Sequence, residues 1–263
     1  MLYIVATPIG NLKEITDRAI ETLNSVDYIL CEDTRTSTTL LNAYDIKKPL
    51  KSYHKFNETK VAPSIIDDLK NGKDIALISD AGTPGISDPG QILIRLAIDN
   101  DIDYTVVSGA SALINAFVLS GFDTPFTFVG FLPDNNTKRK ELLADLKSIN
   151  STLIFYCSPH SITDDLADMF QGLGDRRICV VREISKKFEE KTFCTLSEGY
   201  KGLVKGEFVV VVDKPQKENS ATDLDEDLKI LLGMGISKMD ASKVLAKARG
   251  LKKNDVYKNT FEN

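Results

Sequence analysis

Residues 78–90 are the part of the sequence best suited to holding a ligand. They read ISDAGTPGISDPG, with three glycines and few bulky side chains. Glycine allows backbone amides to approach a ligand closely, and an ordinary turn from strand to helix rarely needs so many residues. The spacing fits neither GxGxxG nor GxxxxGK[ST], which argues against dinucleotide and nucleoside triphosphate sites. We therefore predict a ligand loop of another kind.

Two further loops have the same character. Residues 6–11 read ATPIGN and residues 108–112 read SGASA, and each follows an apolar strand-like segment and precedes a helical pattern. Parallel α/β sheets bind ligands beyond the carboxyl ends of their strands. We therefore expect the three loops to line one edge of a single sheet.

Groups able to move a proton occur in two other segments, at residues 32–35 and 52–55. Histidine is the side chain most often used to move protons at neutral pH, which makes His54 a candidate base, whereas Glu32 or Asp33 needs a raised pKa to act as a base, or else orients a partner. The candidate catalytic residues are therefore His54, Asp33 and Glu32. A packing role for His54 is an equally good interpretation.

Several cationic and aromatic residues are candidates for contacting a substrate. Arg35 can hold a phosphate or pair with Asp33 or Glu32, and the cations at 182–187 can face RNA or form salt bridges. Aromatic rings can stack on an extruded base, although burial in a core is their more common fate. The candidates are Arg35, Tyr53, Lys55, Arg182 and Lys186.

Composition limits the possible classes of protein. The chain has 263 residues, 42% of them hydrophobic and 27% charged, with a formal net charge of −5. This charge opposes broad attraction to nucleic acid, so any RNA contact must come from local basic patches. There is no apolar run long enough for a membrane span and no charged leader, which indicates a cytoplasmic protein with no membrane association. Four widely spaced cysteines without CxxC predict no metal site.

The elements that must position these residues alternate between strand and helix patterns. In the first half, strands are expected at 2–6, 28–31, 75–78 and 104–107, and helices at 16–25, 37–44, 61–70, 91–100 and 110–119. This alternation is typical of a mostly parallel sheet.

The pattern in the second half of the sequence indicates a sheet of a different kind. Strands are expected at 126–129, 152–157, 178–183, 190–195 and 207–212. The run FVVVV at 208–212 is typical of a buried strand, and the two preceding segments are close enough to pair, so this sheet is expected to be mixed.

The turn-rich segment 121–125 suggests a domain boundary. We expect an N-terminal α/β domain at 1–120 with the cofactor and substrate loops, and a second α/β domain at 121–213 that completes the cofactor cleft. Residues 214–263 are expected to form a linker and a small C-terminal helical extension with helices at 228–232 and 237–248. The expected fold class is α/β.

Long ordered motifs in this sequence closely resemble the ribosomal RNA small subunit methyltransferase I family. The resemblance runs in register from residue 2 to about 213. The motifs are VATPIGNL at 5–12, EDTR at 32–35, SYH at 52–54, SDAGTP at 79–84, ISDPG at 86–90, GFLP at 130–133, SPH at 158–160 and KGE at 205–207. One departure is Phe56, which stands where a second histidine is common.

The resemblance implies a fold of the tetrapyrrole methylase type, in which two α/β domains hold a folded S-adenosylmethionine and the chain forms a homodimer. The implied reaction is 2′-O-methylation of a cytidine ribose in small-subunit (16S) ribosomal RNA, as naked RNA or in the assembled small ribosomal subunit. The residues matching the family's cofactor contacts are Pro8, Asp80, Ala81, Gly82, Thr83, Gly109, Ala110, Ser111, Ala112, Phe131 and Leu132.

Two rival functions remain open from the sequence. A methyltransferase acting on a tetrapyrrole or another small metabolite would use the same cofactor pocket, but would present a closed apolar trough to its substrate. A noncatalytic RNA-binding module would bind RNA without any cofactor pocket, and the three intact ligand loops argue against it.

Overall fold

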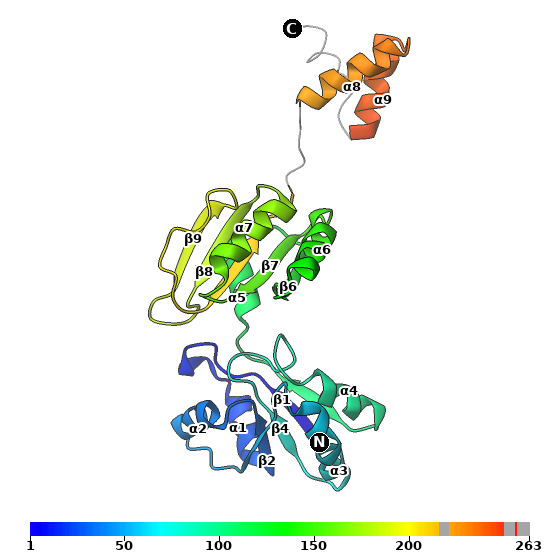
Figure 1. Cartoon of the computed structure of the whole chain (residues 1–263). Helices are drawn as coiled ribbons and strands as arrows, with labels where there is room; N and C mark the ends of the chain where they lie inside the picture. Colours follow the sequence, from blue (N-terminus) through cyan, green and yellow to red (C-terminus); the bar gives the residue numbers. More distant parts are fainter. Residues whose placement is uncertain (216–220, 250–255, 257–263) are drawn as a thin grey trace. The chain divides into compact units, whose positions relative to one another are not determined.

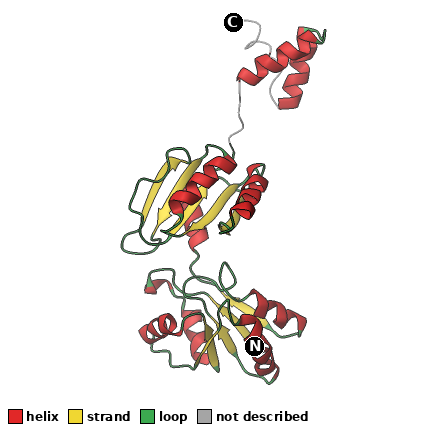
Figure 2. Ribbon diagram, viewed as in Figure 1, coloured by secondary structure: helices red, strands yellow, loops and turns green. Residues whose placement is uncertain are grey.

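The computed structural model describes residues 1–215, 221–249 and 256. The chain divides into two compact units, Met1–Pro215 and Gln216–Asn263. The first unit contains two five-stranded sheets with helices packed on them (Figure 1, Figure 2). The described part of the second unit is helical. These features confirm the predicted α/β class with a small C-terminal helical extension.

The first sheet has the strand order β3-β2-β4-β1-β5, and every pairing within it is parallel, as predicted. Its strands are β1 (Leu2–Val5), β2 (Tyr28–Cys31), β3 (Leu50–Ser52), β4 (Ile75–Leu77) and β5 (Tyr104–Val107). The prediction missed β3, a three-residue edge strand that is half-buried or exposed throughout. Its sequence, LKS, carries little hydrophobic signal.

Helices cover both faces of this sheet. They are α1 (Asp17–Ser25), α2 (Thr34–Ala43), α3 (Glu58–Lys70) and α4 (Gln91–Asp99), and a short 3-10 helix, η1 (Leu12–Glu14), follows β1. Leu23 of α1 and Leu41 of α2 pack in one core, and Ile65 of α3 and Leu93 of α4 pack in another. Helix α2 begins earlier than expected because the Asp33 carboxylate accepts a hydrogen bond from the Arg35 amide and caps it.

The second sheet has the strand order β6-β7-β10-β8-β9. Only the β6–β7 pairing is parallel, so the sheet is mixed, as predicted. Its strands are β6 (Phe126–Phe131), β7 (Thr152–Cys157), β8 (Arg177–Arg182), β9 (Glu190–Thr195) and β10 (Phe208–Val212). Two helices that were not expected, α6 (Asn136–Lys147) and α7 (Ile162–Leu173), lie between its strands in the chain.

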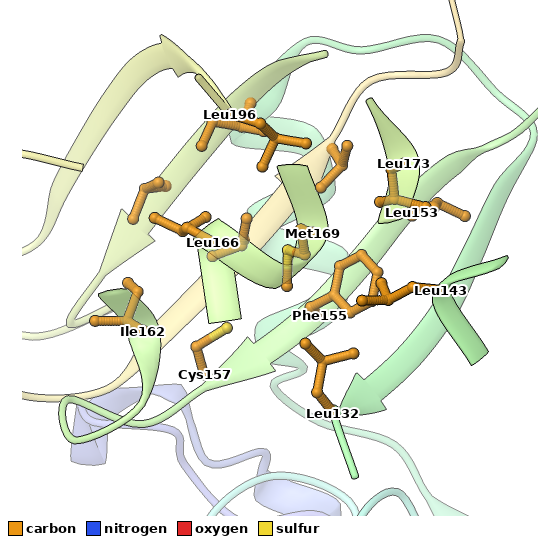
Figure 3. Close-up of a cluster of buried hydrophobic side chains, with 14 of the residues drawn as sticks. Leu132, Leu143, Leu153, Phe155, Cys157, Ile162, Leu166, Met169, Leu173 and Leu196 are labelled. Carbon is orange, nitrogen blue, oxygen red and sulfur yellow. The ribbon is translucent and has the colours of Figure 1, made fainter. Parts of the chain in front are cut away.

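Strand β10 shows how this sheet is buried on both faces. Its residues Phe208, Val210 and Val212 belong to the core that includes α6 and α7, part of which is drawn in Figure 3. Val209 and Val211 face the opposite way, into a core with α5 (Ala112–Ser120). Alternation of side chains along a strand produces these two cores. Helix α5 therefore packs on the second sheet although it follows the last strand of the first.

The C-terminal unit contains α8 (Ala221–Gly233) and α9 (Lys238–Arg249). Leu228, Ala241, Leu245 and Val256 form its buried core. Within the described residues, no helix of the chain is both long enough and apolar enough to cross a membrane.

Candidate functional site

The loops that follow the five parallel strands all leave the carboxyl edge of the first sheet. The strand order places the loops after β3 and β2, which carry the titratable residues, at one end of this edge. The three small-residue loops, after β4, β1 and β5, occupy the rest. Two of these are tied directly, because Thr7 and Gly82 exchange backbone hydrogen bonds of 2.8 and 3.1 Å.

Glycine allows the small-residue loops to lie against one another. A Cβ atom on Gly109 would stand 2.9 Å from the Cβ of Ala6, closer than real Cβ contacts allow. Gly82 adopts a φ of +79°, a conformation that L side chains rarely accept, and a Cβ there would meet Ala110 at 4.0 Å. The predicted gathering of the three loops is therefore a feature of the structure.

A cavity of about 400 Å³ opens beside these loops. Its wall comes from both sheets: the loops after β1, β4 and β5 on one side, and the ends of β6, β7, β8 and β10 on the other. The lining residues are Ile9, Asp80, Ala81, Gly82, Thr83, Ile86, Ser87, Asp88, Ser111, Ala112, Phe131, Tyr156, Cys157, Ser158, Pro159, Ile184, Glu207, Phe208 and Val209.

The predicted cofactor contacts divide into three groups. Seven of them, Asp80 to Thr83, Ser111, Ala112 and Phe131, line the cavity. Pro8, Gly109 and Ala110 lie in the same loops but outside the cavity wall. Leu132 does not line the cavity, because its side chain is 8% exposed and packs in the core with Leu143 of α6 and Leu166 of α7 (Figure 3).

Three carboxylates come together at this end of the sheet: Glu32, Asp80 and Asp88. Burial, together with the nearby charges of Glu32 and Asp80, raises the pKa of Asp88 to about 6, against a hydrogen bond from Ser79 that lowers it. Burial and the charge of Asp80 also raise the pKa of Glu32, and nearby His54 lowers it. Like charges held close in a partly buried site favour retention of a proton.

Asp88 is a cavity residue that the sequence analysis did not select. The available signal was its place in the glycine-rich loop that also carries Asp80, but a single sequence does not reveal which carboxylates of a loop are turned inward. In the structure Asp88 is half-buried and lines the cavity, whereas Glu32 does not reach the cavity wall.

Asp33 is a poor base in this structure. Its carboxylate accepts hydrogen bonds from the side chain of Arg35 at 2.8 and 3.2 Å and from the Arg35 amide at 2.8 Å. These bonds lower the pKa of Asp33 to about 2. Of the two predicted roles of Arg35, the structure shows the ion pair with Asp33. The rest of the Arg35 side chain is open to solvent.

His54 is held in an orientation that favours donation of a hydrogen bond. Its Nδ1 accepts a hydrogen bond of 3.3 Å from the Phe56 amide, and its own amide donates to Asn57 Oδ1 at 2.8 Å. In a neutral imidazole whose Nδ1 accepts, the hydrogen is on Nε2. The Nε2 atom of His54 thus carries a proton rather than a free electron pair, which does not favour the predicted role of His54 as the base.

Tyr53, predicted to contact substrate, is buried. Only 1% of it is exposed, and its hydroxyl donates to Glu58 at 3.4 Å. Stacking of this ring on a base is therefore excluded, because the ring packs in the core with α3 and α4. The neighbouring Lys55 and Phe56 are exposed, and Phe56 is 93% open to solvent.

Arg182 and Lys186, also predicted substrate contacts, form the salt bridges that were the alternative interpretation. Arg182 is 9% exposed and binds Glu190 at 2.9 Å. The Lys186 ammonium binds Glu183 and Glu207, each at 2.8 Å. The structure thus shows the salt-bridged alternative for both cations, and the Lys186 pairs lie in the loop after β8, beside the cavity residues Ile184 and Glu207.

Comparison with known proteins gives consistent similarities. Residues 1–199 match the family described as Tetrapyrrole (Corrin/Porphyrin) Methylases. The chain is 41% identical to the ribosomal RNA small subunit methyltransferase I of Halalkalibacterium halodurans, over 97% of this chain and 93% of the relative. It is 48% identical to the protein of the same name from Mycoplasmopsis pulmonis, over 80% of this chain and 96% of the relative.

Solved structures share the fold at low sequence identity. A diphthine synthase superposes with a TM-score of 0.64 at 13% identity, covering 81% of this chain and 90% of that one. Uroporphyrin-III-C-methyltransferase from Thermus thermophilus superposes with a TM-score of 0.57 at 16% identity, covering 81% of this chain and 94% of the other. These likenesses show a common fold and carry no information on the substrate.

Proposed function

Because this chain belongs to the ribosomal RNA small subunit methyltransferase I family, we propose that it methylates small-subunit ribosomal RNA with S-adenosylmethionine as the methyl donor. The finer proposal is that the methyl group goes to the 2′-oxygen of a cytidine ribose. The observation that carries the proposal is the cavity where the small-residue loops of the first sheet meet the second sheet.

The residues around the cavity fit S-adenosylmethionine. The cavity has a volume in the usual range for small-molecule sites. The loop at 80–83 has room for backbone contacts, and the nearby carboxylates Asp80 and Asp88 complement a positively charged sulfonium. Asp80 to Thr83, Ser111, Ala112 and Phe131 would hold the cofactor. When bound, it supplies an electrophilic methyl group.

The protein's own contribution is to position a ribose hydroxyl and accept its proton. Correct orientation of two reactants removes a large part of the activation barrier of a displacement reaction. A positioned base increases the rate by a further factor of about 10² to 10⁴. We assign the proton acceptor to Asp88, which lines the cavity and whose raised pKa of about 6 keeps it ionised yet basic near neutral pH. His54 Nε2–H is placed to donate to an oxygen of the RNA or to Glu32.

The RNA is proposed to lie across the loops after β2 and β3. Arg35 and Lys55 are exposed cations in these loops, and Phe56 offers an exposed ring whose edge-on neighbour is His54, with the ring centroids 6.1 Å apart. A solvent-exposed aromatic ring among cations can stack on a base while the cations neutralise phosphates.

Replacing Phe56 with alanine is expected to weaken binding of the RNA substrate about fivefold or more, since stacking of one base on an aromatic ring is worth about 1 to 3 kcal/mol. The affinity for S-adenosylmethionine should not change. Filter binding or fluorescence anisotropy with a fragment of small-subunit RNA measures the effect. Phe170→Ala, on the solvent-facing side of α7 at a position that is 41% exposed, is the control. Equal losses in both variants would contradict the assignment.

We also propose a homodimer. Strand β5 lies at the edge of the first sheet, and two of its large apolar side chains, Tyr104 and Val106, are 42% and 49% exposed. The following segment exposes Ile114 and Val118 of α5, the latter at 71%, and Phe126 of β6. Exposed apolar side chains concentrated in one stretch of a chain indicate an interaction surface.

Val118→Asp is expected to convert the protein from dimer to monomer at micromolar concentration, because it places an unpaired charge in the proposed interface. Analytical ultracentrifugation measures the mass directly. Ile98→Asp, at a position of α4 that is 53% exposed, should leave the mass unchanged. A wild-type protein that sediments as a monomer would refute the dimer.

The activity itself is tested with labelled S-adenosylmethionine and small ribosomal subunits that lack the modification. We expect label on RNA, retained through digestion to nucleosides as a 2′-O-methylcytidine. Label on a base atom would refute the ribose assignment and leave RNA methylation standing. Transfer to a small metabolite and not to RNA would refute both.

A further inference from the structure

A chain of hydrogen bonds runs from a buried carboxylate to the cavity wall. Ser161 Oγ donates to Asp165 Oδ2 at 2.7 Å, and the hydroxyls of Ser161 and Ser158 lie 3.0 Å apart. Asp165, in α7, is 4% exposed. Ser158, in the loop after β7, lines the cavity. The network therefore connects the interior of the second sheet's helical layer with the proposed cofactor site.

The carboxylate end of this chain is anchored. Arg139 Nη1 lies 3.5 Å from Asp165 Oδ1 and 2.7 Å from Asp168 Oδ2. Arg139 Nε also donates to the Pro133 carbonyl at 2.9 Å, just after the strand that carries Phe131. Arg139 therefore links Asp165 and Asp168 of α7 to the loop after β6.

The network has only one possible polarity. An ionised carboxylate accepts hydrogen bonds and donates none, and a serine hydroxyl has a single hydrogen. Since Ser161 uses its hydrogen on Asp165, the hydrogen between the two serines must come from Ser158. The remaining electron pairs of Ser158 Oγ have no donor on this path, so Ser158 offers the cavity an acceptor.

The surroundings make this acceptor selective. Tyr156, Pro159, Phe208 and Val209 line the same part of the cavity and present largely apolar surface. Ligand sites commonly combine such apolar walls with a few fixed polar groups that set the orientation of the ligand. A fixed acceptor in such a wall favours an N–H or O–H of the ligand over a carbonyl or carboxylate.

We propose that Ser158 accepts a hydrogen bond from an N–H or O–H group of the bound methyl donor, and that Asp165 is a positioning residue that fixes this polarity through Ser161. The inference rests on the proposed function, because it takes the cavity to be the donor site. The donor group is an amine or hydroxyl of the nucleoside, or the ammonium of the amino-acid part.

Titration calorimetry with S-adenosylhomocysteine tests the proposal without turnover. Ser158→Ala is expected to weaken binding about threefold to tenfold if its partner is neutral, and more than tenfold if it is an ammonium. Repeating the titration with 5′-methylthioadenosine, which lacks the amino-acid part, separates these sources. The loss persists when the partner is on the nucleoside and disappears when it is the ammonium.

The positioning role is tested by Ser161→Ala, alone and combined with Ser158→Ala. The single variant should weaken binding, and it should have no effect once Ser158 is absent, because it acts only through that hydroxyl. Ser148→Ala, at the end of α6, is the control, and thermal melting checks that each variant is folded.

Each outcome bears on a separate statement. Unchanged affinity in Ser158→Ala, with wild-type binding intact, overturns the acceptor and leaves the proposed function standing. A Ser161→Ala loss that persists in the Ser158→Ala background overturns the positioning role. Wild-type protein that binds neither ligand overturns both this inference and the assignment of the cavity.

Discussion

Replacing Gly109 with valine is expected to lower the affinity for S-adenosylmethionine by at least about a hundredfold, with the chain still folded. A Cβ atom at this position would stand 2.9 Å from the Cβ of Ala6 and 3.5 Å from its carbonyl oxygen. The loop after β5 must therefore move away from the loop after β1. Because Ser111 and Ala112 follow directly and line the cavity, the wall moves with it. In catalysis a misplacement of about 1 Å can cost about 10²-fold in rate, and we expect a loss of donor affinity of similar size when the wall itself is displaced.

Calorimetry with the donor measures the loss, and circular dichroism and melting curves show whether the fold persists. The control is Gly233→Ala, at the end of α8, where an added Cβ meets no heavy atom within 4 Å. This control should bind the donor as wild type does. Wild-type affinity in Gly109→Val would mean that these two loops do not shape the site.

Asp88→Asn is expected to have the second large effect, a loss of about 10²- to 10⁴-fold in the rate of methyl transfer, the usual contribution of a positioned base. Asparagine keeps the shape of the side chain but cannot accept the proton. In single turnover, the wild-type rate should rise with pH through about 6, where Asp88 loses its proton. The variant should lose this dependence. Asp67→Asn, on the exposed face of α3, is the control.

The same substitution should stabilise the fold, which separates loss of function from loss of structure. The pKa of Asp88 is raised from its usual 3.8 to about 6 in the folded protein, so between these pH values the folded state binds more protons than the unfolded state. The contribution of Asp88 to the free energy of unfolding therefore falls as the pH rises from 3.8 to about 6. Asp88→Asn should melt higher than wild type at pH 8, and the gap should close near pH 4.

His54→Ala offers the contrasting case. Since His54 Nδ1 is occupied by the Phe56 amide, the ring is a donor, and its loss should cost less than the loss of Asp88. A larger loss in His54→Ala than in Asp88→Asn, with both variants folded and binding the donor, would return the role of base to the histidine.

The edge of the first sheet could be predicted because its geometry follows from local pattern. Apolar strand segments alternate with helices, parallel strands end at a common edge, and the glycine-rich loops follow the strands directly. Asp80 to Thr83 could therefore be predicted to lie beside Ser111 and Ala112 without knowledge of contacts between distant residues. The buried run at 208–212 was equally clear, since β10 lies at the centre of its sheet with neighbours on both sides.

What the sequence could not show depends on partners that are distant along the chain. Lys186 has one partner, Glu183, close to it in the sequence, but its second partner, Glu207, is 21 residues away and could not be predicted from the neighbouring residues. Tyr53 follows a short edge strand, and only the packing of α3 and α4 buries its ring. The raised pKa of Asp88 results from its burial and from the nearby charge of Glu32, a residue that follows a different strand, β2.

Uptake of S-adenosylmethionine by the full-length protein is the most direct measurement of the central claim, which is that the loops after β1, β4 and β5 form a donor site together with the second sheet. Titration calorimetry should show one donor bound per chain in the wild type and at least about a hundredfold weaker binding in Gly109→Val. Folded wild-type protein that takes up no donor, or a Gly109→Val variant that binds it undiminished, would contradict the account.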